Sequence, residues 1–189
     1  MNEKSVGAAS ADGAEASSSK TRRVALIGVM LVLALAASYA ERVAPSPIPA
    51  VPGIKLGLAN AVILIVLYLT NVRTALLLNV MRVVLSGLLF SGVWGAAYGL
   101  SGALLSFAVM ATLQGTRRFG VVGVSIAGGV AHNVGQLLLA AWLVKTPGLA
   151  AYLPMLILSG MVAGTLVGVV AGTCVRRLWS MRKSNKGAF

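Results

Sequence analysis

The stretch PSPIPAVPGIKLGLAN, residues 45–60, separates the first two long apolar segments of the chain and contains four of its six prolines. Proline fixes φ and donates no backbone hydrogen bond, so this spacing favours an extended, polyproline-like strap. Pro52-Gly53 is a turn signal, and a helix carrying Asn60 is predicted to begin near Lys55. Two interpretations are open: a lid with ligand contacts, or a rigid connector with a snorkelling lysine.

The composition is that of an integral membrane protein. The 189 residues are 58% hydrophobic and 11% charged, with a mean hydropathy of +0.89, whereas about a quarter of a soluble domain is charged. The net charge is +12, but the basic residues flank apolar segments, where they orient the chain and contact anionic lipid. This placement argues against a nucleic-acid partner. The single Cys174 indicates a packing residue without a redox role.

Six apolar segments each approach the about 20 residues that cross a bilayer. The spans are expected over residues 24–40, 54–70, 74–90, 93–113, 121–144 and 150–174. The predicted fold is an all-α integral membrane protein, a six-transmembrane-helix bundle covering residues 21–178. Residues 1–20 are expected to form a disordered cytoplasmic tail, and residues 179–189 a basic one. A cleaved signal peptide ending near Ala40 is the alternative for the first span, although the long segment ahead of its arginines weakens it.

The basic residues also predict the orientation of the bundle. Six spans place both termini on one side, which carries twelve Lys and Arg residues against three on the other. The twelve are Lys4, Lys20, Arg22, Arg23, Arg73, Arg117, Arg118, Arg176, Arg177, Arg182, Lys183 and Lys186, and the three are Arg42, Lys55 and Lys145. By the positive-inside rule both termini are cytoplasmic, so the strap faces outward.

Small residues repeat every four positions on three of the predicted spans. The repeats are Gly160, Gly164, Gly168 and Gly172 on the sixth span, Gly95, Gly99 and Ala103 on the fourth, and Ala36 and Ala40 on the first. Such faces let helices approach closely where lipid offers no hydrophobic driving force. The two glycine faces are expected to pack inside the bundle, whereas the first span's face either packs inside or docks another membrane protein.

A few polar side chains interrupt the predicted spans: Asn60, Asn79, Arg82, His132, Asn133 and Gln136. An ionisable group at mid-membrane costs several kcal/mol and usually faces a cavity or a partner. Arg82 lies about 12 Å into its span at 1.5 Å per residue. No span contains an acidic residue, and Glu41, at the outer end of the first span, is expected to be too distant to neutralise Arg82. Backbone carbonyls, amides, water or an external anion are the remaining partners.

These polar residues predict a binding pocket in the outer half of the bundle. His132 and Gln136 share a helix face, Asn79 shares one with Arg82, and Asn60 lies at a similar depth. Lys55, Arg82 and the amide donors suit a small anion, or an organic molecule that bears a carboxylate or phosphate. For His132 a hydrogen bond to a neighbouring helix is the alternative.

Several missing motifs narrow the mechanism. The chain contains no GxxxxGK[ST] nucleotide-binding loop. Its only aspartate is Asp12, so no aspartate cluster exists to hold magnesium on a diphosphate. No span carboxylate supports proton or sodium coupling, and no nucleophile with a base is evident around the single His132. We therefore predict that the chain is not an enzyme, needs no metal or cofactor, and would drive transport only through a partner.

Three motifs carry a family resemblance: PGIKLGLAN at 52–60, NVMRVVLSG at 79–87 and HNVGQ at 132–136. Together they resemble the Gx transporter family, also described as heptaprenyl diphosphate synthase component I, over about residues 22–178. That family resembles the substrate-binding S components of energy-coupling factor (ECF) transporters, which are small six-helix proteins with an outward lid between the first two spans.

The resemblance implies a function and its partners. The chain would capture a small, anionic solute in a prokaryotic plasma membrane and dock on an ECF coupling subunit driven by two ATPase subunits. The docking contact would use an Ala-xxx-Ala face, which Ala36 and Ala40 match. The family's older name implies the competing hypothesis, a non-catalytic membrane accessory of heptaprenyl diphosphate synthesis in isoprenoid or menaquinone production.

Overall fold

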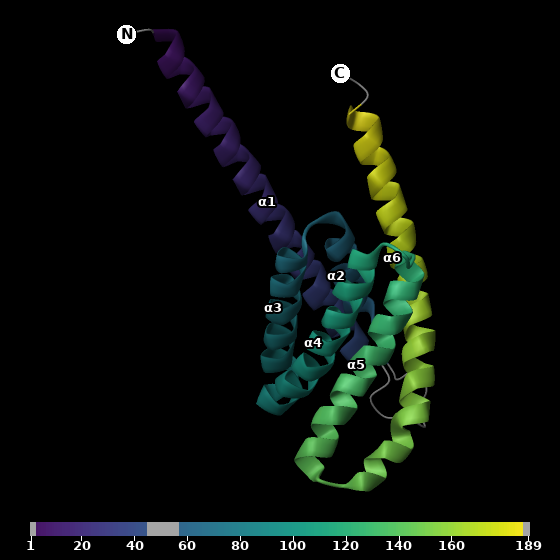
Figure 1. Cartoon of the computed structure of the whole chain (residues 1–189). Helices are drawn as coiled ribbons and strands as arrows, with labels where there is room; N and C mark the ends of the chain where they lie inside the picture. The colour runs from purple at the N-terminus through teal and green to yellow at the C-terminus, as the bar shows by residue number, and fades with distance from the viewer. Residues whose placement is uncertain (1–2, 45–56, 187–189) are drawn as a thin grey trace.

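The computed structural model describes residues 3–44 and 57–186, and the regular structure in these residues is entirely helical (Figure 1). The elements are α1 (Glu3–Val43), α2 (Leu58–Leu69), α3 (Val72–Phe90), α4 (Gly92–Thr116), α5 (Val121–Val144), the 3-10 helix η1 (Pro147–Tyr152) and α6 (Leu153–Lys186). Five of the helices are long and apolar enough to cross a membrane. The all-α membrane bundle predicted from the sequence is confirmed.

The second helix is shorter than predicted. A span was expected over residues 54–70, but α2 has 12 residues, about 18 Å of helix against the about 30 Å of the hydrocarbon core. Gly57 precedes α2 with φ 80°, a left-handed conformation that glycine adopts at no steric cost. The four prolines of the strap and Lys55 lie outside the described residues.

Both terminal helices extend further than predicted. Helix α1 begins at Glu3, so the segment 1–20 is largely helical where its composition predicted a disordered tail. Several alanines, and the absence of proline, give this stretch a reasonable helix propensity. Helix α6 likewise runs through the predicted basic tail to Lys186, the residue before Gly187. Helix α5 occupies the predicted residues 121–144.

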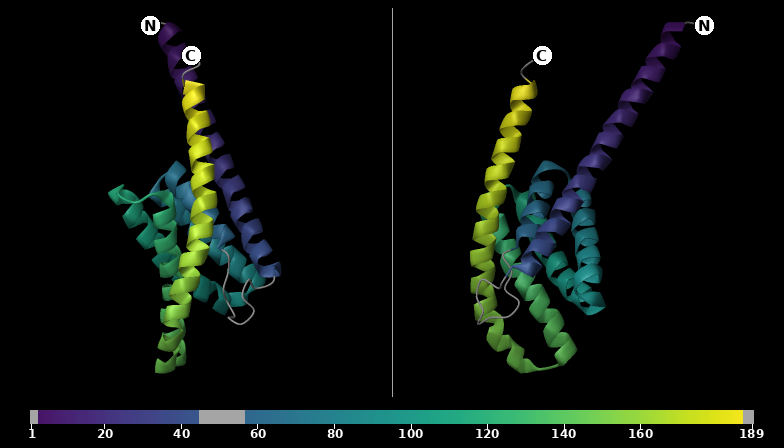
Figure 2. Two further views of the ribbon diagram at one scale, coloured as in Figure 1. Left: turned by 90° about the vertical axis from the view of Figure 1, so that its right-hand side faces the viewer. Right: turned by 180° about the vertical axis from the view of Figure 1, so that it is seen from behind.

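The two termini lie at the same end of the bundle (Figures 1 and 2). The α2–α3 and α4–α5 turns lie at that end too, whereas the α3–α4 turn and η1 lie at the opposite end. The termini therefore share an end with Arg73, Arg117 and Arg118, as the charge pattern predicted. The positive-inside rule predicts that this end faces the cytoplasm.

Large apolar side chains cover the outside of the bundle, while the short α2 is largely buried. Trp94 and Trp142 are 74% and 73% exposed, whereas Ile63 and Leu64 on α2 are fully buried. A soluble protein rarely exposes apolar area so extensively. In a bilayer these side chains contact lipid.

The glycine face of α6 packs against α5, as predicted. A Cβ atom built on Gly164 would lie 2.7 Å from the Cα atom of Ile126, and one on Gly160 would lie 2.8 Å from the carbonyl oxygen of Gly129. These distances leave no room for a methyl group between the two backbones. On α4, a Cβ atom on Gly99 would lie 3.2 Å from Val83 of α3. Both predicted glycine faces therefore pack within the molecule.

Candidate functional site

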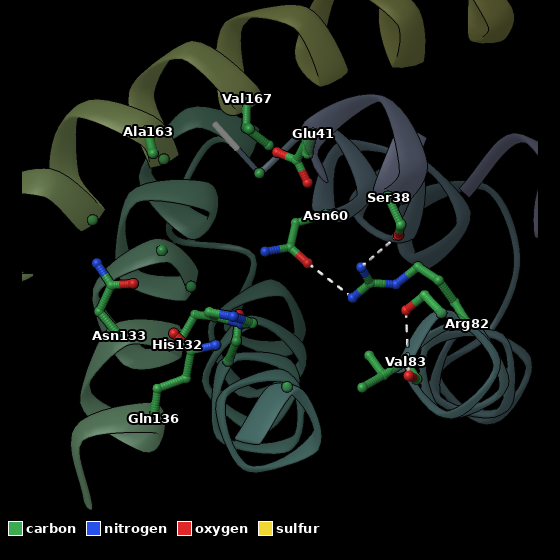
Figure 3. A pocket seen from close by; sticks show the side chains of 18 of the residues that line it. Ser38, Glu41, Asn60, Arg82, Val83, His132, Asn133, Gln136, Ala163 and Val167 are labelled. Atoms are coloured by element: carbon green, nitrogen blue, oxygen red, sulfur yellow. Dashed lines mark hydrogen bonds between the residues drawn. The ribbon is translucent and has the colours of Figure 1, made fainter. Parts of the chain in front are cut away.

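A cavity of about 130 Å³ lies among the helices, and all six α-helices contribute to its walls. Several of its lining residues are glycine or serine, whose small side chains leave space at the centre of the bundle. Its polar lining residues include Ser38, Glu41, Arg42, Asn60, Arg82, His132, Asn133 and Gln136. Figure 3 shows most of these side chains directed toward a common space.

Arg82 of α3 extends its guanidinium group into this cavity (Figure 3). The side chain is only 7% exposed. One terminal nitrogen donates hydrogen bonds to Oδ1 of Asn60 at 3.2 Å and to Oδ1 of Asn79 at 3.0 Å, and the other donates to Oγ of Ser38 at 3.5 Å. Its Nε has no hydrogen-bond partner among the described residues. All of these acceptors are neutral, so the guanidinium has no hydrogen-bonded counterion among the described residues.

Two of the three acceptors around Arg82 are held by the backbone of their own or a neighbouring helix. Nδ2 of Asn79 donates to the carbonyl oxygen of Ala103 on α4 at 3.2 Å, and Oγ of Ser38 donates to the carbonyl oxygen of Ala34 at 2.9 Å. These bonds direct the acceptor oxygens toward the guanidinium. The positive group is thus fixed before any ligand arrives, which lowers the entropic cost of binding.

Asn79→Leu should reduce the stability of the bundle by about 2–3 kcal/mol, because the substitution deprives both the Ala103 carbonyl and the Arg82 guanidinium of a buried hydrogen-bond partner. Asn79 is 2% exposed and joins α3 to α4 while orienting Arg82. Denaturant titration of the purified protein measures the loss. Asn71→Leu is the control, since Asn71 caps the same helix at an exposed position, and it should lose only the about 1 kcal/mol of a helix cap. Equal losses in both variants would contradict the interhelical role of Asn79.

The opposite wall of the cavity is formed by α5 (Figure 3). A Cβ atom built on Gly102 of α4 would lie 2.8 Å from Cγ of Gln136 and 3.0 Å from Nε2 of His132. Both side chains therefore depend on a bare backbone at Gly102 for their positions. Nδ2 of Asn133 donates to the carbonyl oxygen of Leu156 at 2.8 Å and to Oγ of Ser159 at 3.1 Å. Asn133 thus joins α5 to α6 while it also lines the cavity.

The predicted pocket residues divide into three groups. Asn60, Arg82, His132, Asn133 and Gln136 line one cavity. Asn79 is not among the lining residues and instead accepts a hydrogen bond from Arg82. Lys55 lies outside the described residues.

Glu41 was expected to be too distant to neutralise Arg82, and it forms no hydrogen bond to Arg82, but it lies nearer than the sequence suggested. Glu41 lines the same cavity as Arg82, and its Oε1 accepts a hydrogen bond from the backbone nitrogen of Leu58 at 2.7 Å. The end of α1 and the start of α2 meet at this point, a juxtaposition that spacing along the chain does not reveal. Within the described contacts Glu41 forms no ion pair with Arg82.

Ser38 and Arg42 also line the cavity, although neither was predicted from the sequence. Arg42 donates a hydrogen bond from its guanidinium to Oγ of Ser91 in the α3–α4 turn. The available signal was the charged Glu41-Arg42 pair at the end of an apolar span, immediately before the proline strap. Glu41 connects α1 to the start of α2, and Arg42 connects α1 to the α3–α4 turn.

Ala36 and Ala40, the predicted docking residues, are both exposed on α1. Helix α1 packs on α2 and α3 through its other face, where Ala34 is fully buried. The alanine face is therefore left uncovered by the described parts of the chain. The described residues also contain no cluster of His, Cys, Asp and Glu that would hold a metal ion.

Comparison with known proteins places these features in a family context. A family model described as heptaprenyl diphosphate synthase component I matches residues 30–174, about three-quarters of the chain. The match includes every described segment that lines the cavity. No curated protein and no solved structure matches the sequence.

Proposed function

We propose, from the premise that the chain belongs to the heptaprenyl diphosphate synthase component I family, that it binds a small organic anion within the membrane. In this proposal it is the substrate-binding S component of an ECF-type uptake transporter in a prokaryotic plasma membrane. The observation that carries the proposal is Arg82, whose hydrogen bonds on the wall of a cavity all go to neutral oxygens and none to a carboxylate. A buried charge without a counterion is costly in a bilayer, so its retention favours a ligand that supplies one.

The proposed role needs no catalysis by this chain. Arg82 and Asn60 offer hydrogen-bond donors to an anion, and His132 and Gln136 offer polar contacts on the facing wall. The substrate would be bound from the outer side and passed on with energy from two ATPase subunits acting through a coupling subunit. Ligand capture is tested by native mass spectrometry of the full chain, gently extracted from its own membranes. A small anion retained by the wild type and lost from a cavity variant supports the proposal, and identical spectra from both contradict it.

Ala36→Trp combined with Ala40→Trp should remove the coupling subunit and both ATPases from the purified complex. Bulky rings on this face would prevent the close helix contact that small residues permit. Co-purification measures the effect, and ligand binding should change less than about 3-fold because both alanines are exposed away from the cavity. The matched control is Leu138→Trp, a 60% exposed position on α5, which should leave the complex intact. A complex that survives the double substitution contradicts the docking face.

The family description favours a second candidate function, a membrane accessory of a heptaprenyl diphosphate synthase. On this hypothesis a soluble, aspartate-rich synthase should co-purify with the chain in place of ATPases. Its rate or product length should then change when the chain is omitted from a reconstituted reaction. A synthase that neither binds the chain nor responds to it would exclude this candidate.

A further inference from the structure

We infer that the ligand of the central cavity is a small monoanion, of the monocarboxylate class, and not an isoprenoid diphosphate. This inference rests on the proposed binding function and adds the charge and size of the ligand. It is carried by Glu41, by the volume of the cavity and by the orientation of Asn60 beside Arg82.

The charged side chains of the described cavity wall are Arg42, Arg82 and Glu41, and a ligand with one negative charge balances them. Arg82 is the buried cation, and Arg42 is exposed at the edge, bonded to the α3–α4 turn. Glu41 adds a carboxylate to the same wall, held in place by the backbone nitrogen of Leu58. A ligand with two or three negative charges would meet this carboxylate in surroundings of low dielectric, where like charges repel strongly. A single anionic group neutralises Arg82 and is repelled by Glu41 less than a ligand with two or three charges would be.

The volume of the partly open cavity also favours a small ligand. A cavity of about 130 Å³ is slightly smaller than the about 150 Å³ apolar cavity that holds one benzene molecule, which has about six non-hydrogen atoms. A carboxylate with a short chain or a single ring is of comparable size once side chains adjust. A diphosphate that carries even one isoprene unit is substantially larger than benzene. An isoprenoid chain of several units is larger still.

The hydrogen-bonding groups beside Arg82 suit a carboxylate. Oδ1 of Asn60 accepts from Arg82, so its Nδ2 points away from the guanidinium toward the α5 wall (Figure 3). The guanidinium and this amide nitrogen are both donors, which match the acceptor oxygens of a carboxylate. His132 and Gln136 then face the remainder of the ligand from α5. The cavity thus has a charged donor end and a neutral polar end.

The test is a charge series on matched skeletons, measured by calorimetry with the full chain in lipid nanodiscs. Each monocarboxylate of about five to ten non-hydrogen atoms is paired with its primary amide and with the phosphate of the same skeleton, for example benzoate, benzamide and phenyl phosphate. Isopentenyl diphosphate is the isoprenoid probe. The wild type should bind its best carboxylate at least about 10-fold more tightly than the matched amide and phosphate. Phosphate monoesters carry close to two negative charges at neutral pH, which makes them the dianionic comparison.

Glu41→Gln provides the second arm, because glutamine keeps an acceptor for the backbone nitrogen of Leu58 while it removes the charge. This variant should bind the phosphate at least about 10-fold more tightly than the wild type does, since the like-charge repulsion is gone. Its affinity for the carboxylate should rise by a smaller factor, because one negative charge is repelled less strongly than two. If this variant does not fold, the charge series on the wild type still tests the inference by itself.

The outcomes separate this inference from the proposed function. If the phosphate or isopentenyl diphosphate binds the wild type as tightly as the carboxylates, and Arg82→Gln abolishes that binding, the monoanion inference is overturned and the binding function stands. If no probe binds in a manner that depends on Arg82, both are overturned. Amides that bind as tightly as the carboxylates also overturn the inference.

Discussion

Gly164→Ala should lower the free energy of unfolding of the bundle by about 2–3 kcal/mol, within the range measured for overpacked cores. The added Cβ atom would lie 2.7 Å from the Cα atom of Ile126 and 2.7 Å from the carbonyl oxygen of Ser125. Both contacts are to backbone, so no side-chain rotation relieves them and α5 and α6 must move apart. Unfolding of the purified protein by denaturant, followed by circular dichroism, measures the loss.

Gly172→Ala is the matched control because it belongs to the same repeat on the same helix. A Cβ atom there would have its nearest neighbours at 3.7 and 3.8 Å, on the side chain of Val121, which is an ordinary van der Waals distance. Replacing glycine by alanine inside a helix stabilises it by about 0.5–1 kcal/mol, so this variant should be at least as stable as the wild type. Similar stabilities for the two variants would mean that α5 and α6 are not in backbone contact at Gly164.

Arg82→Gln should weaken binding of the small anion retained by the wild type by about 10- to 100-fold. A hydrogen bond to a charged group contributes about 1.5–3 kcal/mol, and each factor of ten corresponds to about 1.4 kcal/mol. Glutamine retains a polar group near Asn60 and Asn79 but removes the charge. Calorimetric titration of the protein in nanodiscs measures the change in Kd. The control Arg73→Gln removes an exposed arginine from the start of the same helix and should leave Kd unchanged.

A stability measurement on Arg82→Gln separates a binding role from a structural one. If Arg82 serves the ligand, the ligand-free variant should be as stable as the wild type or more stable, because a buried charge without a carboxylate partner is removed. If Arg82 instead holds α1, α2 and α3 together through Ser38, Asn60 and Asn79, the variant should lose stability and retain its affinity for the anion. The second pattern would contradict the proposed site.

The candidate site was only partly predictable, for reasons that lie in particular residues. Arg82 could be identified because an ionisable group inside an apolar span is expensive wherever the helix is placed. The support that Asn79 gives it through Ala103 of α4 depends on how two helices pack, which local spacing does not specify. Glu41 was excluded for the same reason, since its approach to the cavity depends on where α2 begins.

More of the fold than of the site could be predicted from the sequence. The repeat of Gly160, Gly164 and Gly168 predicted close packing because small residues matter only where backbones meet, and each of them is in backbone contact with α5. The length of α2 was overestimated because apolar residues continue upstream of Gly57. The left-handed backbone at that glycine instead makes α2 begin at Leu58. Helix α1 was underestimated at its start because a polar composition does not prevent helix formation in an alanine-rich segment.

By itself the amino-acid sequence determined that this protein is a helical membrane bundle with one exceptional charge. Those properties follow from the cost of placing polar groups in hydrocarbon, which is a sum over single residues and can be evaluated along the chain. Only the tertiary structure decided that Glu41 shares a cavity with Arg82 and that Asn79 lies behind it. These placements arise from contacts between helices that are distant in sequence, and such contacts depend on the packing of the whole bundle.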